Sequence, residues 1–285
     1  MMSFVKTPLK KSTLFARFVR NYTDINVPGE TTFALIKPDG MNHLGDIFDI
    51  VHEEGFYIKE LRMSKFNKAK AKVFYSDHFD KDYYPPFADF ICSGPIIGMN
   101  LARIDAIRHW KKVTGPRSLE KAKVEFPESI RARFAQSDRV NTVHGADSEK
   151  NYVRESTLFF SDDTLMTKMP PVYPNTILML TPSILQGGKL GKIMREISES
   201  GCRINAMQNF SIEDLNEMER ILGQEEANKV IRKKISGGYT MLLDISHESG
   251  YDILLEEMLR IENTYDTGFS HFDRGEEKLS DKVFL

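Results

Sequence analysis

The sequence predicts an α+β fold, namely a ferredoxin-like βαββαβ sheet covered by helices, with the unit duplicated and the second copy truncated. Three observations lead to this prediction. The chain has 285 residues, about twice the length of a typical single domain. Short apolar strand patterns alternate with helical periodicity through the first half. Several of these patterns then return in the same order after residue 174.

The first copy is expected over residues 31–162. It opens with the apolar run 31–36, typical of a buried strand, which ends at Lys37 and Pro38. Apolar residues from Leu44 to Val51 then follow helical spacing as far as Gly55. The further elements expected are a strand at 56–66, helices at 68–79 and 87–92, a strand at 96–101, a helix at 104–113, a long loop after Gly115, a short helix at 129–134, a strand at 141–144 and a helix at 148–159. This order gives a four-stranded, mostly antiparallel sheet covered by helices.

The second copy is expected over residues 175–262, after a proline-rich stretch at 170–174 that blocks both helix and strand. Its first strand ends at Thr181-Pro182, as the earlier one ends at Lys37-Pro38. The remaining elements expected are an amphipathic helix at 190–197, a strand at 239–243, a helix at 251–261 and an extended polar tail at 263–285. This copy therefore stops after its third strand and a long helix.

The N-terminal arm, residues 1–30, carries charge that the net value conceals. The chain has 39 Lys and Arg against 41 Asp and Glu, so no overall field marks it as a nucleic-acid binder. Its first 23 residues nevertheless contain five basic residues and no acid. Such an arm could be a mitochondrial presequence, a solvated tail or a segment that lies against an acidic partner surface.

Two further features exclude classes of protein. No window approaches the roughly 18 apolar residues that cross a bilayer, so no membrane span is expected. The two cysteines, Cys92 and Cys202, lie far apart and give no disulfide framework. A reducing, cytoplasmic setting is expected, with the mitochondrial matrix as the alternative.

His144 is the first candidate for chemistry. It ends a predicted strand, precedes Gly145 and a helix, and could offer one ring nitrogen to a substrate. Glu155 on that helix could hold the other nitrogen and fix the tautomer. Taken alone, a histidine in this position is more often structural.

Basic residues could form a phosphate cradle around this histidine. Lys37 follows a buried strand, while Lys111 and Arg131 lie on two predicted helices. The sequence has no Walker loop and no G-x-G-x-x-G motif, so any phosphate binding must use side chains.

Four separate stretches carry a family resemblance. They are Thr32-Phe-Ala-Leu-Ile-Lys-Pro-Asp-Gly40, Ser93-Gly-Pro95, Ser129-Ile-Arg131 and Asn141-Thr-Val-His-Gly-Ala-Asp-Ser148. In this order and spacing they resemble the nucleoside diphosphate kinase family over residues 31–160. The second copy, a short loop between Gly40 and Gly45 and the stretch 105–116 are most similar to its two-domain, axoneme-associated branch. Members of that branch begin with a DM10 domain, in whose place this sequence has the basic arm.

The resemblance implies a ping-pong reaction in which the γ-phosphate of a nucleoside triphosphate moves to a histidine and then to a diphosphate, with Mg²⁺ held by the phosphates rather than by a protein metal site. His144 would be the nucleophile and Glu155 its orienter. The resemblance also assigns Lys37 and Tyr75 to the transferring phosphoryl group, Arg131 and Lys111 to phosphates, Asn141 to the ribose and Tyr83 to stacking on the base.

The sequence departs from the family pattern at several of these positions. Tyr83 replaces a phenylalanine, and Lys111 replaces an arginine, which loses a bidentate fork. Arg117 aligns with a phosphate-binding threonine, Asp138 with an apolar residue beside the base and Ala146 with a serine. These departures predict weaker nucleotide binding, because each lost hydrogen bond to a charged group costs roughly 1.5 to 3 kcal/mol.

The second copy has no equivalent chemistry. Thr181-Pro-Ser183 stands where the first copy has Lys37-Pro-Asp39, and no Asn-x-x-His-Gly motif follows Tyr239. It is therefore expected to dock or to mimic a dimer partner, through intramolecular or homotypic pairing.

Two functions remain open at this point. One is an active kinase resident in the ciliary or flagellar axoneme. The other is a weak or inactive structural protein inside doublet microtubules, which only binds nucleotide and contacts tubulin or other axonemal proteins through its arm, tail and second copy. The basic arm suits an acidic surface such as that of tubulin.

Overall fold

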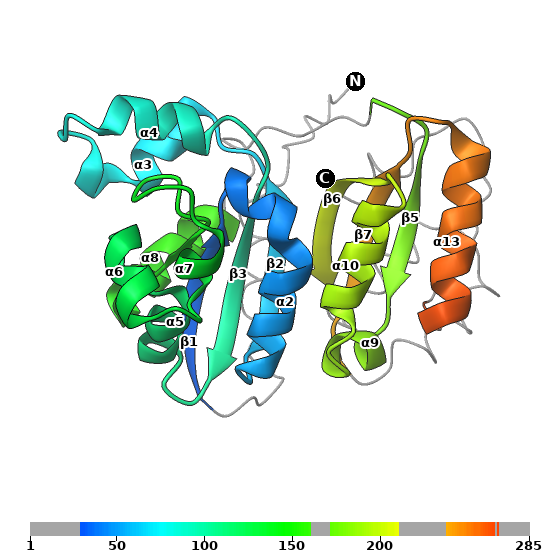
Figure 1. Cartoon of the computed structure of the whole chain (residues 1–285), viewed down its shortest axis with the longest axis horizontal. Coiled ribbons are helices and arrows are strands. Elements are labelled where there is room, and N and C mark those ends of the chain that lie inside the picture. Colours follow the sequence, from blue (N-terminus) through cyan, green and yellow to red (C-terminus); the bar gives the residue numbers. More distant parts are fainter. Residues whose placement is uncertain (1–28, 161–171, 211–237, 266, 268–285) are drawn as a thin grey trace, which may run out of the picture.

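The computed structural model describes residues 29–160, 172–210, 238–265 and 267. The expectations for the arm before residue 29, for the first part of the proline-rich boundary and for the tail after residue 267 lie outside these residues. The described residues form one antiparallel sheet of seven strands in the order β4-β1-β3-β2-β6-β7-β5, with helices on its faces (Figure 1). The α+β prediction is confirmed, and the strands of both halves belong to a single sheet.

The first unit, residues 29–160, supplies four strands of this sheet. They are β1 (Glu30–Ile36), β2 (Tyr57–Ser64), β3 (Ile96–Arg103) and β4 (Val143–Gly145). Its helices are η1 (Pro38–His43), α2 (Leu44–Glu53), α3 (Lys68–Phe74), η2 (Ser76–His78), α4 (Tyr84–Ile91), α5 (Ala106–Thr114), α6 (Leu119–Glu125), α7 (Ile130–Phe134) and α8 (Glu149–Phe160). The strand order β4-β1-β3-β2 is the one expected for a βαββαβ unit.

The second unit, residues 172–210 and 238–267, supplies the other three strands. Its elements are β5 (Asn175–Leu180), α9 (Pro182–Gln186), α10 (Leu190–Glu199), β6 (Arg203–Phe210), β7 (Thr240–Ser246) and α13 (Tyr251–Tyr265). Helix α13 continues three residues into the region expected as an extended tail.

Both units pair their strands in the same register. In the first, β1 pairs with β3 so that Phe33 faces Asn100, and in the second, β5 pairs with β7 so that Ile177 faces Asp244. The next ladders, β2–β3 and β6–β7, each contain one irregularity, between Ile58 and Glu60 and between Ile204 and Ala206. The apolar patterns of the two halves therefore produce the same local arrangement.

Several elements of the first unit differ in extent from the predictions; the helix expected at 87–92, for example, spans Tyr84–Ile91. The helix expected from residue 104 begins at Ala106, because Asp105 adopts a left-handed conformation (φ 58°) that interrupts helical geometry. The helix expected at 68–79 ends at Phe74 and is followed by η2. The loop expected after Gly115 contains α6, whose N-cap residue Ser118 accepts a hydrogen bond from the Lys121 amide.

The apolar core has two parts. A large cluster runs under α2, α5, α10 and α13 and includes side chains from both units, among them Ile47, Trp110 and Ile193. A second cluster lies on the other face of the first unit, where Phe74 and Phe159 each pack tilted against Phe33. No helix in the described ranges is long and apolar enough to span a membrane.

The junction between the units consists of paired helices and paired strand edges. Helices α2 and α10 cross where Gly45 meets Gly191, so closely that a Cβ at Gly45 would lie 2.8 Å from the Gly191 carbonyl oxygen. Arg195 on α10 forms ion pairs with Asp46 (3.4 Å) and Asp49 (2.5 Å) on α2.

A second polar contact joins the two strand edges at this junction. The Asn209 side chain accepts a hydrogen bond from the Leu61 amide (2.6 Å) and donates one to the Lys59 carbonyl (3.2 Å). Strand β2 is thus covered along its edge by β6, which protects an otherwise open row of backbone groups.

Candidate active site

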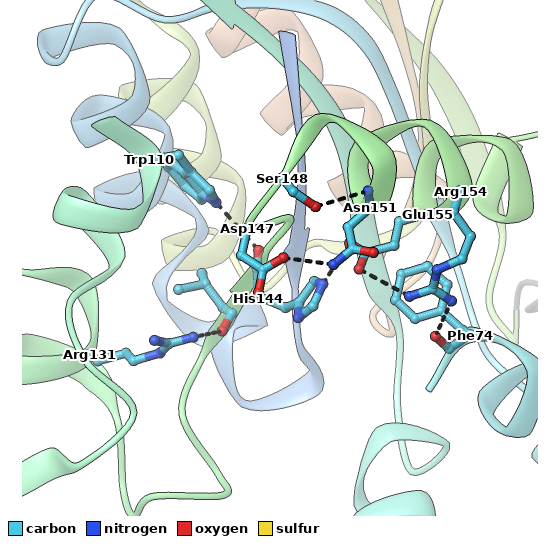
Figure 2. Close-up of polar contacts among 10 residues, drawn as sticks. Phe74, Trp110, Arg131, His144, Asp147, Ser148, Asn151, Arg154 and Glu155 are labelled. Carbon is cyan, nitrogen blue, oxygen red and sulfur yellow. Dashed lines mark hydrogen bonds and ion pairs between the residues drawn. The ribbon is translucent and has the colours of Figure 1, made fainter. Parts of the chain in front are cut away.

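His144 lies on the edge strand β4, beside Leu35 of β1. Its Nε2 atom is 2.7 Å from Oε2 of Glu155 on α8, and the Glu155 side chain is buried (Figure 2). A carboxylate accepts a hydrogen bond here, so we assign the proton to Nε2, which leaves the lone pair of Nδ1 for a ligand. The pair predicted from the sequence is therefore in contact.

Backbone geometry fixes the place of this histidine. Thr142, two residues earlier, is buried and has φ 67°, an uncommon conformation for a β-branched residue. Asp39 stabilises it, because Oδ2 accepts hydrogen bonds from the Thr142 amide (2.8 Å) and hydroxyl (3.2 Å). Gly145 is required on the other side, where a Cβ would collide with the Trp110 ring.

Lys37 is buried at the end of β1, and its ammonium group donates a hydrogen bond to Oδ1 of Asn141. Burial, together with the charge of Arg131, lowers the pKa of Lys37 to about 7. Asn141 also donates from Nδ2 to the Asp138 carbonyl (2.7 Å). The structure thus brings Lys37 and Asn141 together, with the amide orienting the ammonium group.

Tyr75 follows α3 and lies against His144, with its ring edge-on to the imidazole at 5.8 Å between centroids. Its hydroxyl is buried and has no hydrogen-bond partner among the described residues. Burial, and next the charge of Glu155, raise the pKa of this hydroxyl, which is therefore neutral and able to donate. A buried donor without a partner is suited to a ligand oxygen.

Arg131 on α7 braces the backbone of the site. Its guanidinium donates to the carbonyls of Gly115 (2.6 Å) and Val143 (3.0 Å), the residue before His144. Its Nε atom is buried and unpartnered within the described part of the chain. Burial, and then the charge of Arg117, lower the pKa of Arg131 to about 10.

The residues predicted to contact the nucleotide border this centre. Tyr83 lies beside it, where its hydroxyl is 2.6 Å from His78 Nδ1 and the Arg139 guanidinium lies 5.7 Å from its ring centroid. Lys111, on α5, is exposed, and its charge contributes to lowering the pKa of Asp147, which is lowered mainly by a hydrogen bond from Asn151.

The departures from the family pattern also find places here. Arg117 is exposed and its charge acts on Lys37, Tyr75 and Arg131, so it adds a cation to the site. Asp138 accepts a hydrogen bond from the Leu119 amide (2.8 Å) and thereby holds the start of α6. Ala146 is buried in the phenylalanine-rich cluster.

Sequence reasoning missed three of these features. Arg154, beside Glu155, contacts both that carboxylate and the end of α3. His78 pairs with Tyr83, and Arg139 covers the Tyr83 ring. Only Arg154 had a sequence signal, namely a basic residue next to the expected orienting carboxylate.

The donor set around His144 fits a magnesium-bound polyphosphate better than a free cation. Lys37, Arg117 and Arg131 present positive charge, and no group of three or more His, Cys, Asp or Glu side chains within the described residues could hold a metal ion. Magnesium binds oxygen ligands, which a nucleotide supplies through its phosphates.

Among the described residues of the second unit, the equivalent place holds none of these groups. Thr181 follows β5 as Lys37 follows β1, and its hydroxyl lies 2.9 Å from that of Ser183. One of these hydroxyls donates a hydrogen bond to the other.

Taken together, the first unit has a histidine–carboxylate pair bordered by lysine, arginine and tyrosine, an arrangement suited to phosphoryl groups. Comparison with known proteins also points to a protein that handles phosphoryl groups. The family described as "Nucleoside diphosphate kinase" matches residues 30–165. The chain is 37% identical over 130 residues to the "Probable nucleoside diphosphate kinase 5" of Arabidopsis thaliana, covering 45% of this chain and 90% of that relative. The chain belongs to the nucleoside diphosphate kinase family.

Other relatives match a larger part of the chain. The "Nucleoside diphosphate kinase homolog 7" of Rattus norvegicus is 35% identical over 189 residues, which is 66% of this chain and 48% of that protein. The chain thus spans about half the length of this relative. The chain is also 34% identical to the Aquifex aeolicus nucleoside diphosphate kinase, for which a crystal structure is known. That match covers 48% of this chain and 99% of the Aquifex chain, with a TM-score of 0.45.

Proposed function

We propose that the first unit transfers the γ-phosphate of a nucleoside triphosphate to a nucleoside diphosphate through a phosphohistidine at His144. The observation that carries the proposal is the hydrogen bond between Nε2 of His144 and the Glu155 carboxylate. This bond leaves Nδ1 as the nucleophile, beside a group of cations.

Two displacements at phosphorus make up the reaction. In the first, the Nδ1 lone pair forms an N–P bond to the γ-phosphorus while the bond to the bridging β-phosphate oxygen breaks, and the diphosphate leaves. In the second, a terminal oxygen of another diphosphate attacks that phosphorus and the N–P bond breaks, which restores the neutral imidazole. Bound Mg²⁺ supplies neutralisation of the phosphate charge.

The chain's own side chains hold the reacting groups. Lys37 and Arg117 offset charge on the phosphates, and the free hydroxyl of Tyr75 donates to a phosphoryl oxygen. Arg131 keeps Val143, and with it His144, in place. Asn141 orients Lys37 and binds the ribose, while Tyr83 stacks on the base and the exposed Lys111 supplies a further cation to the phosphates.

A transfer assay tests this proposal. Purified protein is mixed with Mg-ATP and a diphosphate of a different base, and the new triphosphate is measured. We expect His144→Asn to lower the rate at least about 10³-fold, while His109→Asn, a change at a histidine that pairs with Glu54 outside the site, leaves it unchanged. Equal rates for the unmutated protein and His144→Asn would overturn the proposal and leave a nucleotide-binding unit.

We also propose that the second unit is a degenerate copy that pairs with the first in place of a second protein chain. The equal strand order, the equal register and the packing of α2 on α10 support this role. Sedimentation of the protein across a wide concentration range tests it, since a monomer is expected. A dimer that dissociates when β2 is altered would contradict it.

Finally, we propose that the protein resides in the ciliary or flagellar axoneme, where it contacts tubulin or neighbouring proteins. This part of the proposal is supported by the resemblance of the sequence to the axoneme-associated branch of the family and by the five basic residues in the first 23. Deletion of residues 1–23 should weaken co-sedimentation with microtubules, and the loss should shrink as salt is raised. Equal binding by the deleted and full chains would remove this role from the arm.

A further inference from the structure

The Arg154 side chain joins two parts of the active site that come from different elements. From α8, its Nη1 donates to the Phe74 carbonyl (3.1 Å) and its Nη2 lies 3.4 Å from Oε1 of Glu155 (Figure 2). Phe74 is the last residue of α3, where helix carbonyls lack partners within the helix and favour a cation. The guanidinium therefore ties the end of α3 to the carboxylate that holds His144.

The two oxygens of Glu155 have separate partners. Oε2 accepts from His144 Nε2 at 2.7 Å, whereas Oε1 faces Arg154. The carboxylate is buried, with 5% of its side chain exposed, so it has little water to replace either partner. With one oxygen held by Arg154, the carboxylate plane is fixed, and so is the direction of the hydrogen bond to the imidazole.

The other end of the contact lies next to residues that touch the nucleophile. The Phe74 ring packs against His144 at 5.9 Å between centroids, and Tyr75 follows directly in the chain. One side chain thus contacts the segment that places Tyr75 and the group that orients His144.

We propose that Arg154 is a positioning residue for phosphoryl transfer, which acts through Glu155 and the end of α3 without touching the substrate. This inference rests on the proposed function of His144. A lysine at this position can keep the charge but has no planar fork to reach both acceptors, so charge and geometry can be separated by mutation.

The test uses Arg154→Gln and Arg154→Lys, with Lys150→Gln as the matched control. Lys150 lies on the same helix and is exposed, so its change removes one positive charge from α8 without altering these contacts. The rate of His144 phosphorylation by Mg-ATP and the dissociation constant of ADP are measured. We expect Arg154→Gln to slow phosphorylation about 10-fold or more while ADP affinity stays within about 2-fold.

A second readout does not depend on turnover. The proton on His144 Nε2, held by Glu155, should give a low-field ¹H resonance that His144→Asn removes. We expect Lys150→Gln to keep this resonance, Arg154→Gln to weaken or shift it, and Arg154→Lys to be intermediate in both the resonance and the rate.

The outcomes separate the two proposals. If the unmutated protein is not phosphorylated but the resonance responds to Arg154, the proposed function fails and with it the role in phosphoryl transfer, while Arg154 still orients the His144–Glu155 pair. If Arg154→Gln matches Lys150→Gln in rate and resonance, the positioning role is overturned. If Arg154→Gln is too unstable to measure, Arg154→Lys decides, because a wild-type rate and resonance in that variant would overturn the need for the fork.

Discussion

The two units of this chain share a strand arrangement and differ in what stands at the strand ends. In both, a buried strand leads into a proline, but Lys37 precedes it in the first unit and Thr181 in the second. Lys37 is buried, lies within the field of the Arg131 charge and donates a hydrogen bond to Asn141. The Thr181 hydroxyl, in contrast, shares a hydrogen bond with that of Ser183. Apolar periodicity therefore maintains the fold in both units, while a few polar residues decide whether a unit can carry chemistry.

The largest effect expected from this comparison concerns the matched positions 37 and 181. Lys37→Met should lower phosphoryl transfer by about 10² to 10³-fold, since it removes a buried cation beside the reacting phosphate. Thr181→Met, at the equivalent place in the second unit, should leave transfer unchanged. Initial rates of both variants check this, and a loss of transfer in Thr181→Met would show that the second unit takes part in the reaction.

The next effect concerns the contact between the units. Gly191→Leu should destabilise the chain by about 2 to 4 kcal/mol, because the helix crossing at Gly45 has no room for a side chain. Denaturant unfolding measures the change. Leu185→Met, a volume-conserving change on α9, serves as the control. A Gly191→Leu protein as stable as this control would mean that the two units are not packed as described.

A smaller effect is expected at the strand edge of the same junction. Asn209→Ala removes the acceptor for the Leu61 amide, and a buried amide without a partner costs about 1 to 3 kcal/mol. Hydrogen exchange should then show faster exchange of the Leu61 amide. Unchanged exchange and stability would argue that β6 does not cover the edge of β2.

The smallest effect is a pH dependence of nucleotide binding. The pKa of Lys37 is about 7 because of burial and of the neighbouring Arg131 charge, and a bound phosphate anion should raise it. Above pH 7 binding must then take up a proton, so ADP affinity should fall by at most about tenfold per pH unit, or about 1.4 kcal/mol.

Titration calorimetry between pH 7.5 and 9.5, in buffers of different ionisation enthalpy, measures this proton uptake. Tyr75, whose pKa is raised by burial, stays neutral over this range and does not contribute. Lys37→Met should remove the uptake. An equal uptake in that variant would assign the proton to another group.

Much of the fold could be predicted because periodic apolar residues report burial directly. The strand at Glu30–Ile36 and the helices at Leu44–Glu53 and Leu190–Glu199 follow from such patterns. Helix α6 was missed, since it has few apolar residues and its main signal is the Ser118 cap. The junction of the two units could not be predicted, because its contacts include Asn209 and two glycines, none of which belongs to an apolar periodic pattern.

The contact between His144 and Glu155 could be predicted, because a strand followed directly by a helix brings these two positions together. The partners of Lys37 and Arg131 could not, since they come from sequence-distant carbonyl and amide groups that only the tertiary structure brings close. The same reason applies to the hydrogen bond from Arg154 to the Phe74 carbonyl, which joins residues far apart in the sequence.

The most direct test of the central claim is to locate the phosphoryl group. The purified chain is incubated with Mg-ATP, digested under alkaline conditions that preserve phosphohistidine, and its peptides are mapped by mass spectrometry. We predict one phosphoryl group, on the peptide that contains His144, and none on the peptides that contain His247 or His271. Phosphorylation of a second-unit histidine, or of no histidine while nucleotide is bound, would contradict a division of labour in which only the first unit carries the reaction.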